Sequence, residues 1–134
     1  MVIPAFSSLW AHYPHGDSVS VKRQIGGNVN LAWVTNTCVI RISRAFNKAG
    51  APIPSTVPGL STIRGGDGKR YAYRVREFRR FLETRVRPAD LTGDVSGAKG
   101  IILFEVSGWS DATGHFDLWD GSNCAHQWPK SAYS

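Results

Sequence analysis

Cys38 and four histidines are the residues whose types and positions suggest covalent chemistry. Cys38 follows Thr35-Asn36-Thr37 and begins a segment with helical periodicity, which places it in the first turn of a predicted helix. Free backbone N–H groups and the helix dipole favour a thiolate there, and such settings lower a thiol pKa from about 8.5 to roughly 3.5–7.5. The same N–H groups could receive the oxyanion formed when a thiolate attacks an amide. A buried cysteine is more often a small apolar core residue, so position alone assigns no nucleophile.

A cysteine nucleophile needs a base, and histidine is the usual one at neutral pH. His12 and His15 flank Pro14 near a predicted turn, which favours an ordinary surface role. His115 begins a predicted strand directly after Gly114, where a strand can present its imidazole to the end of a helix. An early helix-start cysteine followed by a strand histidine resembles the layout of papain-like amidases. Cys38 and His115 are therefore the predicted nucleophile and base.

A third group should hold the imidazole at the nitrogen that faces away from the thiol. His126 lies across the predicted Gly121-Ser-Asn turn, and a hairpin centred near 120–121 pairs residue 115 with roughly 125–127. Asp117 shares a strand face with His115, but lies about 6–7 Å away along the chain and should project parallel to the imidazole. We predict that His126 orients His115, with Asp117 as the alternative.

Three predicted helices precede a predicted group of strands. The helices span residues 4–14, 38–50 and 75–86, the first stopped by Pro14 and the last by Pro88. In the second helix the buried stripe consists of Val39, Ile42, Phe46 and Ala49. Asn36 or Thr37 is expected to cap its start, and Gly50 to end it.

The predicted strands lie mainly at the end of the chain. We expect antiparallel strands at 101–106, 115–120 and 124–128, a short strand at 70–75, a turn at 26–28 and a surface loop at 51–70. Helices first and a strand meander last indicate an α+β fold. The length of 134 residues suits one domain, 1–134.

The charge predicts an anionic partner. The formal net charge is +6, and nine of the sixteen basic residues fall between Arg64 and Arg87. Nucleic acid, a membrane surface and the anionic bacterial wall all fit this balance, and so does a solvated helix face. No apolar run reaches eighteen residues, and residues 1–30 hold no charged leader followed by an apolar core. We therefore expect neither membrane insertion nor a conventional signal peptide.

Metal and nucleotide motifs are absent from the sequence. There is no CxxC pair and no HExxH, and Gly65-Gly-Asp-Gly68 lacks the Lys-Ser/Thr ending of a phosphate loop. We expect no metal and no other cofactor. Two cysteines are too few for a disulfide-stapled secreted scaffold.

Three blocks together carry a family resemblance: Leu9–Pro14, Asn36–Pro54 and Gly100–Gly121. They resemble the fourth family of type VI secretion amidase effectors, with the nucleophile helix in the second block and the catalytic histidine in the third. Cys38 and His115 fall on the family's catalytic positions, and Tyr13 in the first block is a candidate for supporting the substrate or the oxyanion.

The resemblance implies an NlpC-type, papain-like fold and hydrolysis of the γ-D-glutamyl–meso-diaminopimelate bond in peptidoglycan stems. It further implies a toxin made in the cytoplasm without a signal peptide, carried by a type VI secretion component, and released in the periplasm of a rival cell. A cognate immunity protein would protect the producer.

The resemblance is incomplete near the C-terminus. Members of the family usually place an Asp shortly after a cysteine in the final strand region, where this chain has Cys124-Ala-His126. Related NlpC-type enzymes accept His, Asn or Gln there, which supports His126. No cysteine follows Cys124, so the family's C-terminal disulfide is missing and Cys124 is expected to be an unpaired thiol.

Two other functions compete with this interpretation. A phage or housekeeping wall hydrolase would use the same chemistry in another role, although the missing leader disfavours a self-exported enzyme. A nucleic-acid-binding protein would use Arg70–Arg87 as its basic helix and would need no nucleophile, and its binding would weaken steeply with salt.

Overall fold

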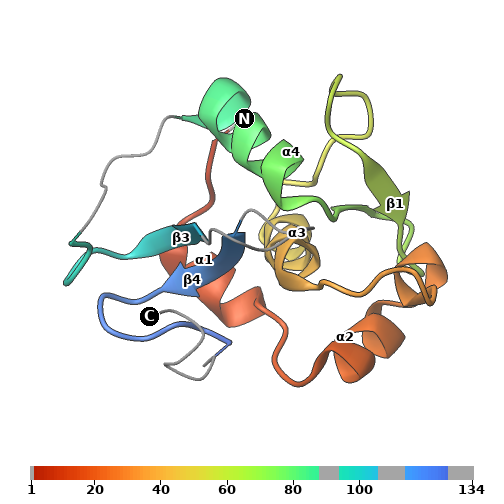
Figure 1. Cartoon of the computed structure of the whole chain (residues 1–134), viewed down its shortest axis with the longest axis horizontal. Helices are drawn as coiled ribbons and strands as arrows, with labels where there is room; N and C mark the ends of the chain where they lie inside the picture. Colours follow the sequence, from red (N-terminus) through yellow and green to blue (C-terminus); the bar gives the residue numbers. More distant parts are fainter. Residues whose placement is uncertain (1, 88–93, 106–113, 127–134) are drawn as a thin grey trace.

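The computed structural model describes residues 2–87, 94–105 and 114–126. Figure 1 shows the central helix α3 end-on, with α4 above it, α2 to the lower right and the β3–β4 pair to the left. The elements, in chain order, are α1 (Phe6–His12), α2 (Ser18–Ile25), η1 (Gly27–Asn30), α3 (Cys38–Lys48), β1 (Thr62–Arg64), β2 (Arg70–Ala72), α4 (Val75–Phe81), η2 (Leu82–Val86), β3 (Gly100–Glu105) and β4 (Gly114–Trp119).

Helix α3 confirms the clearest prediction from the sequence. It begins at Cys38, whose backbone N–H donates to Asn36 Oδ1 at 3.0 Å, so Asn36 provides the expected side-chain contact at the helix start. Thr37 occupies the N-cap position without such a bond. Gly50 follows the helix with a φ of 88°, the left-handed conformation that suits glycine. These local signals place Cys38 in the first turn.

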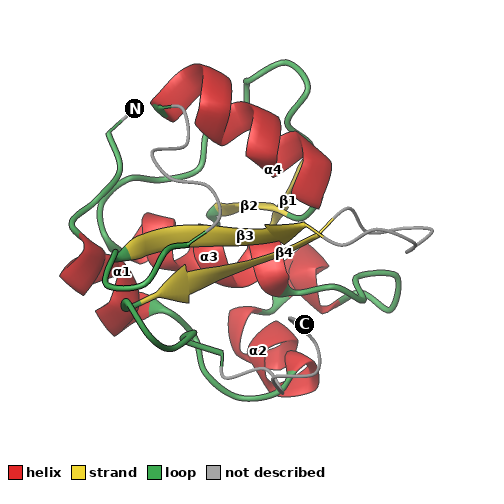
Figure 2. Cartoon of the chain, turned by 60° about the vertical axis from the view of Figure 1, so that its left-hand side comes forward, coloured by secondary structure: helices red, strands yellow, loops and turns green. Residues whose placement is uncertain are grey.

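The pair β3–β4 confirms two of the three predicted terminal strands. Its antiparallel register places Phe104 opposite His115 and Ile102 opposite Asp117. Gly114 allows the strands to approach, because a Cβ there would lie 2.4 Å from the Phe104 carbonyl oxygen. Figure 2 shows both strands running across one side of α3.

The expected third strand is reduced to a short bridged segment in the described residues. Cys124 forms an isolated antiparallel β-bridge with Trp119 through the backbone. The Ala125 N–H donates to the Leu118 carbonyl oxygen at 3.0 Å. Residues 127 and 128 of the prediction lie outside the described residues.

Two elements were missed by the sequence analysis. Helix α2 begins at Ser18 and is capped by Asp17, whose Oδ1 accepts from the Ser20 N–H at 2.7 Å, but only Val21 and Ile25 of this short helix are buried. Strand β1 lies inside the expected surface loop 51–70 and pairs with β2 in a separate two-stranded sheet. Strands of three residues are too short to show alternation, so their pairing is not visible in the sequence.

The first and third predicted helices are confirmed with shorter bounds. Helix α1 ends two residues before Pro14, and α4 passes at Leu82 into a π-type turn that closes with an Arg87 N–H to Leu82 carbonyl bond of 2.8 Å. The described helices include none that is both long and apolar enough to cross a membrane.

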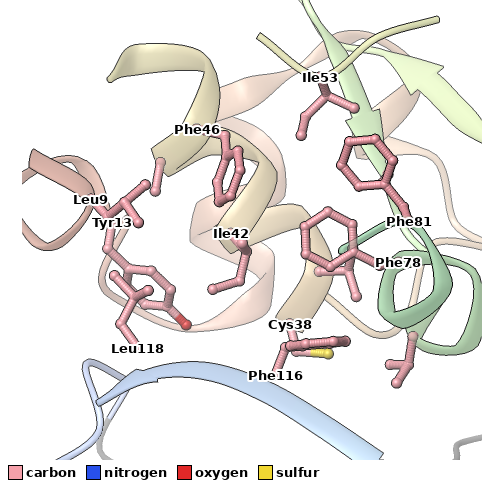
Figure 3. Packing of buried hydrophobic residues seen from close by; sticks show 14 of the residues in the cluster. Leu9, Tyr13, Cys38, Ile42, Phe46, Ile53, Phe78, Phe81, Phe116 and Leu118 are labelled. Atoms are coloured by element: carbon pink, nitrogen blue, oxygen red, sulfur yellow. The ribbon is translucent and has the colours of Figure 1, made fainter. Parts of the chain in front are cut away.

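An aromatic chain fixes β4 against the helices. Phe46 of α3 contacts Phe78 of α4 edge-on at 6.2 Å, and Phe78 contacts Phe116 of β4 edge-on at 5.3 Å. Figure 3 shows this packing, with Cys38 at its edge beside Phe116. Edge-to-face pairs of this kind add to the free energy of area burial. The α+β prediction is confirmed, and the core positions the strand that carries His115.

Candidate active site

Cys38 lies where the N-terminus of α3 meets β4, with only 2% of its surface exposed. Figure 3 places its side chain next to Phe116, the residue that follows His115. The backbone N–H groups of Phe116 and Val39 and the Asn36 side chain lower the thiol pKa, but burial outweighs them and raises it to about 11. The expected lowering of the pKa is therefore wrong for this state, in which the thiol is protonated at neutral pH.

His115 and Asp117 form a buried pair on β4. His115 Nε2 lies 3.3 Å from Asp117 Oδ2, and the two residues are 5% and 0% exposed. The imidazole also stacks on Phe104 of β3, with ring centroids 6.5 Å apart and planes tilted by 13°. The sequence predicted that Asp117 lies too far along the strand to reach the His115 imidazole. That expectation is wrong, because the two side chains, two positions apart on β4, approach to 3.3 Å.

His126 lies opposite Asp117 and not opposite His115. The Trp119–Cys124 bridge and the Ala125–Leu118 bond set this register, which differs from the predicted pairing of residue 115 with 125–127. The His126 backbone N–H donates to Asp117 Oδ1 at 3.3 Å. Burial and the charge of Arg41 lower the pKa of the His126 imidazole, which keeps the ring neutral at neutral pH.

Asp117 makes several hydrogen bonds within the site. Besides His115 and the His126 N–H, its Oδ1 accepts from the Leu118 N–H at 2.8 Å. A carboxylate with no solvent exposure requires such donors, because burial without them costs several kcal/mol. The arrangement gives His115 an anionic neighbour that is itself held by the backbone.

Tyr13 and Arg41 border the same site from the other side. Tyr13 is 2% exposed, and burial and the neighbouring Asp117 carboxylate raise its pKa, so the phenol stays protonated. Its Oη makes no hydrogen bond of standard geometry to the described residues, although the Asp117 side chain lies close enough to affect it. Arg41 was not singled out in the sequence, although it follows Cys38 by three positions and so shares a face of α3 with it.

An open groove of about 730 Å³ lies beside this cluster. It runs between the segment before α2 and the turn after β4, and its lining consists of Trp10, His15, Gly16, Asp17, Asp120, Asn123, Cys124, Ala125 and His126. Cys124 and Cys38 are both buried, and neither forms a disulfide in the described part of the chain. Within the described ranges, no three His, Cys, Asp or Glu side chains gather closely enough to hold a metal ion.

Residues 34–134 match the family model of the type VI secretion system amidase effector protein 4, Tae4. The chain belongs to this family. Among solved structures it is similar to Tae4 of the Enterobacter cloacae Tae4–Tai4 effector–immunity complex, with 31% identity and a TM-score of 0.86 over 98% of this chain and 93% of that one. It is also similar to Tae4 of the Salmonella typhimurium Tae4–Tai4 effector–immunity system, with 34% identity and a TM-score of 0.86 over 93% and 87% of the two chains.

A comparison with curated protein sequences gives no significant match. The similarity to the Tae4 structures confirms the expected fold, because it covers nearly the whole chain. Together with the family match, it shows that the chain is an amidase effector of this family. The family match also covers Cys38, His115, Asp117 and His126. Of the sequence-predicted site residues, the fold brings all four and Tyr13 into one region.

Proposed function

We propose that this Tae4-family chain is a cysteine amidase that hydrolyses the γ-D-glutamyl–meso-diaminopimelate bond of peptidoglycan stems. The observation that carries the proposal is the meeting of Cys38, at the start of α3, with the strand that holds the His115–Asp117 pair. A thiol, an imidazole and a carboxylate in one buried cluster are the groups that acyl transfer through a thioester requires.

In the first half of the proposed reaction, His115 takes the Cys38 proton while Sγ attacks the amide carbon. Because Asp117 occupies Nε2, Nδ1 is the nitrogen assigned to this exchange. The thiol with a pKa of about 11 makes transfer during the attack the appropriate description, since little thiolate exists beforehand at neutral pH. Backbone N–H groups in the first turn of α3 are the candidate donors to the oxyanion.

In the second half, the tetrahedral intermediate collapses and the C–N bond breaks. The diaminopimelate amine leaves with the proton held by His115, and Cys38 remains as a thioester of the γ-D-glutamyl carboxyl group. His115 then removes a proton from water, the resulting attack breaks the C–S bond, and the thiol is restored. We assign Asp117 the role of holding the imidazole throughout, and Tyr13 that of a protonated hydrogen-bond donor beside it.

In this proposal His126 supports the site through its backbone N–H group. Its N–H group fixes Asp117 Oδ1, and its neutral ring borders the groove beside the pair. The sequence-based alternative, in which the His126 ring itself orients His115, has a neutral imidazole where Asp117 provides an anion. A carboxylate stabilises an imidazolium more strongly, which favours Asp117 for the role.

The biological setting follows from family membership. Tae4 of Enterobacter cloacae and of Salmonella typhimurium each occur in complexes with the immunity protein Tai4. We propose that this chain likewise has a cognate immunity protein, is carried by a type VI secretion component, and acts on peptidoglycan in the periplasm of a target cell.

Digestion of purified wall fragments tests the function. Wild type should release fragments with free γ-D-glutamyl carboxyl ends and new diaminopimelate amines, identified by mass spectrometry. Cys38→Ser should keep the fold and lose activity by more than about a thousand-fold, because a serine lacks the nucleophilicity of a thiolate. Cys124→Ser, the matched control, should remain active. Products cut at the lactyl–alanine bond or in the glycan would refute the proposed bond, and reversed behaviour of the two variants would refute the nucleophile.

A further inference from the structure

An exposed tryptophan lies between η1 and α3, and the proposed reaction does not use it. Trp33 keeps 54% of its surface exposed, whereas Val34 beside it is 3% exposed and belongs to a core cluster with Ile40. The Val34 N–H donates to the Leu31 carbonyl oxygen at 3.1 Å, which closes a turn with Trp33 at its third position. The buried neighbour and the turn together hold the indole at the surface.

Two further side chains are packed around this indole. The Trp33 and Tyr73 rings meet edge-on, with centroids 5.2 Å apart and planes at 70°. Tyr73 packs against the same core cluster as Val34. The Arg74 guanidinium lies over the Tyr73 ring at 5.4 Å from its centroid, and the Arg74 side chain is 62% exposed. Because an edge contact covers a face of only one ring, aromatic surface stays open beside a cation. We call Trp33, Tyr73 and Arg74 the aromatic platform.

The aromatic platform is tied to the nucleophile helix from two sides. Trp33 precedes Cys38 by five residues, so their Cα atoms are at most about 18 Å apart. Tyr73 follows Ala72, whose N–H donates to Ser43 Oγ at 3.1 Å and whose carbonyl oxygen accepts from the same hydroxyl at 3.3 Å. Ser43 belongs to α3. A ligand on the platform would therefore be held at a fixed position relative to α3.

The three side chains of the platform suit a sugar ring. One face of a pyranose carries axial C–H groups, which pack against the electron-rich face of an indole or a phenol. Its rim carries hydroxyl groups and, in N-acetylated amino sugars, a carbonyl oxygen, and these accept hydrogen bonds from a guanidinium. A single exposed apolar side chain is ordinary on a protein surface. An indole, a phenol and a guanidinium packed against one another supply both halves of sugar recognition.

We propose that the aromatic platform binds an N-acetylated amino sugar of the wall glycan and so directs the attached stem peptide to Cys38. The proposal rests on the function assigned above, because that function supplies a substrate whose stems are joined to a glycan chain. A lactyl group and two residues link the sugar to the scissile bond, a span of roughly 10 Å when extended. This span is compatible with the limit on the separation of Trp33 and Cys38, so one substrate molecule can occupy both.

Sugar binding is tested with a β-1,4-linked hexamer of N-acetylglucosamine, which carries no stem peptide. The chain has five tryptophans, so the Trp33 indole N–H signal in the NMR spectrum is assigned by its absence from Trp33→Phe. This signal should shift when the hexamer is added to the wild-type protein. Trp33→Leu, which keeps apolar bulk without a ring, should bind about ten-fold more weakly, and Trp33→Phe within about three-fold of wild type.

Leu31→Ala is the matched control, because Leu31 is an apolar residue of the same turn and is 42% exposed. It should bind the hexamer as wild type does. No shift of the Trp33 signal, or equal weakening in Leu31→Ala and Trp33→Leu, would overturn the proposal. Circular dichroism checks the fold. If Trp33→Leu is unfolded, Arg74→Gln takes its place and should weaken binding by about three-fold, because guanidinium donors are lost.

A stacked nucleobase would use the same ring faces, so a single-stranded thymidine octamer is the competing ligand. Binding of the uncharged hexamer should stay constant between about 50 and 200 mM salt, since no counterions are released. Tighter binding of the octamer than of the hexamer, through the Trp33 signal and with a steep loss over the same salt range, would assign the platform to nucleic acid instead.

Kinetics test whether the platform serves the reaction. The substrates are soluble glycan fragments that carry stem peptides and the same stem peptides without glycan. The ratio of their kcat/KM values, glycan-linked over free, should fall by about ten-fold in Trp33→Leu and stay constant in Leu31→Ala. If wild type cleaves neither substrate, the proposed function fails while the hexamer titration still decides whether the platform binds sugar. An equal loss on both substrates would overturn the role in directing the stem.

Discussion

At Cys38, burial and the helix N-terminus act in opposite directions on the thiol. The N-terminal N–H groups of α3 favour the thiolate, but removal from water penalises it more, and the pKa rises to about 11. A protonated resting thiol avoids an uncompensated charge in the core. It also means that the base must act during attack and not before it.

Alkylation of Cys38 by iodoacetamide should therefore be slow at pH 7 and should accelerate as the pH rises toward about 11. The raised pKa leaves less than about one thiol in a thousand ionised at neutral pH. The rate is measured by mass spectrometry in a Cys124→Ser background, which removes the second thiol. A rate that reaches its plateau below pH 8 would show that the thiolate is stabilised in the resting protein.

The two candidate orienting residues can be separated by substitution. Asp117→Asn should lower kcat by at least about a hundred-fold, because an amide cannot supply the negative charge that stabilises the imidazolium. His126→Ala should cost about ten-fold or less, since its backbone N–H to Asp117 remains. Circular dichroism checks that both variants are folded. A greater loss in His126→Ala than in Asp117→Asn would return the role to the His126 ring.

Among the secondary-structure elements, α4 has the task of holding β4 and α3 at the right spacing. Phe78 is fully buried between Phe46 and Phe116, so its ring links three elements that are far apart in the sequence. The strand that carries His115 thus depends on a helix that contributes no residue to the site. Strand position and catalytic geometry are coupled through packing.

Phe78→Ala should destabilise the fold by about 3–5 kcal/mol, the usual cost of emptying a buried aromatic site. Phe6→Ala is the matched control, because Phe6 is only partly buried and contacts Trp10 at the edge of the core. It should cost clearly less. Both values come from chemical unfolding curves. Equal losses of unfolding free energy in the two variants would mean that the Phe46–Phe78–Phe116 contacts do not contribute more to stability than an aromatic pair at the edge of the core.

For the molecule as a whole, positive charge is concentrated along α4. Arg79 and Arg80 are exposed, and Arg79 pairs with Glu83 at 2.9 Å. Part of the net charge of +6 of the chain therefore lies on a helix that packs its opposite face into the core. Such a face accelerates association with an anionic wall or an acidic protein and loses its effect at high salt.

Arg80→Glu should slow association with isolated wall and reduce its salt dependence, while the turnover of a small soluble stem peptide stays unchanged. Arg23→Glu on α2 is the matched control: it makes the same charge change on the other side of α3 (Figure 1) and should have a smaller effect. The comparison uses sedimentation binding at several salt concentrations. An equal loss on the soluble peptide would show that the substitution acts on the site itself.

The sequence by itself determined the features that depend on neighbours along the chain. Helical periodicity and the signals at Asn36 and Gly50 locate α3 and place Cys38 in its first turn, and the pattern around Gly114 locates the strand of His115. The motifs around these two residues also indicate the family, which the match of residues 34–134 to the family model confirms. These properties need no knowledge of what packs against them.

Only the tertiary structure decided which residues of the site contact one another. The register of the last turn puts His126 opposite Asp117, a shift that the turn residues alone do not specify. The burial that raises the Cys38 pKa and isolates the charge of Arg41 comes from β4 and from the segment before α2, both distant in sequence. Burial and cross-strand pairing are sums over non-local contacts, so a local pattern can name the groups but cannot fix their partners or their protonation.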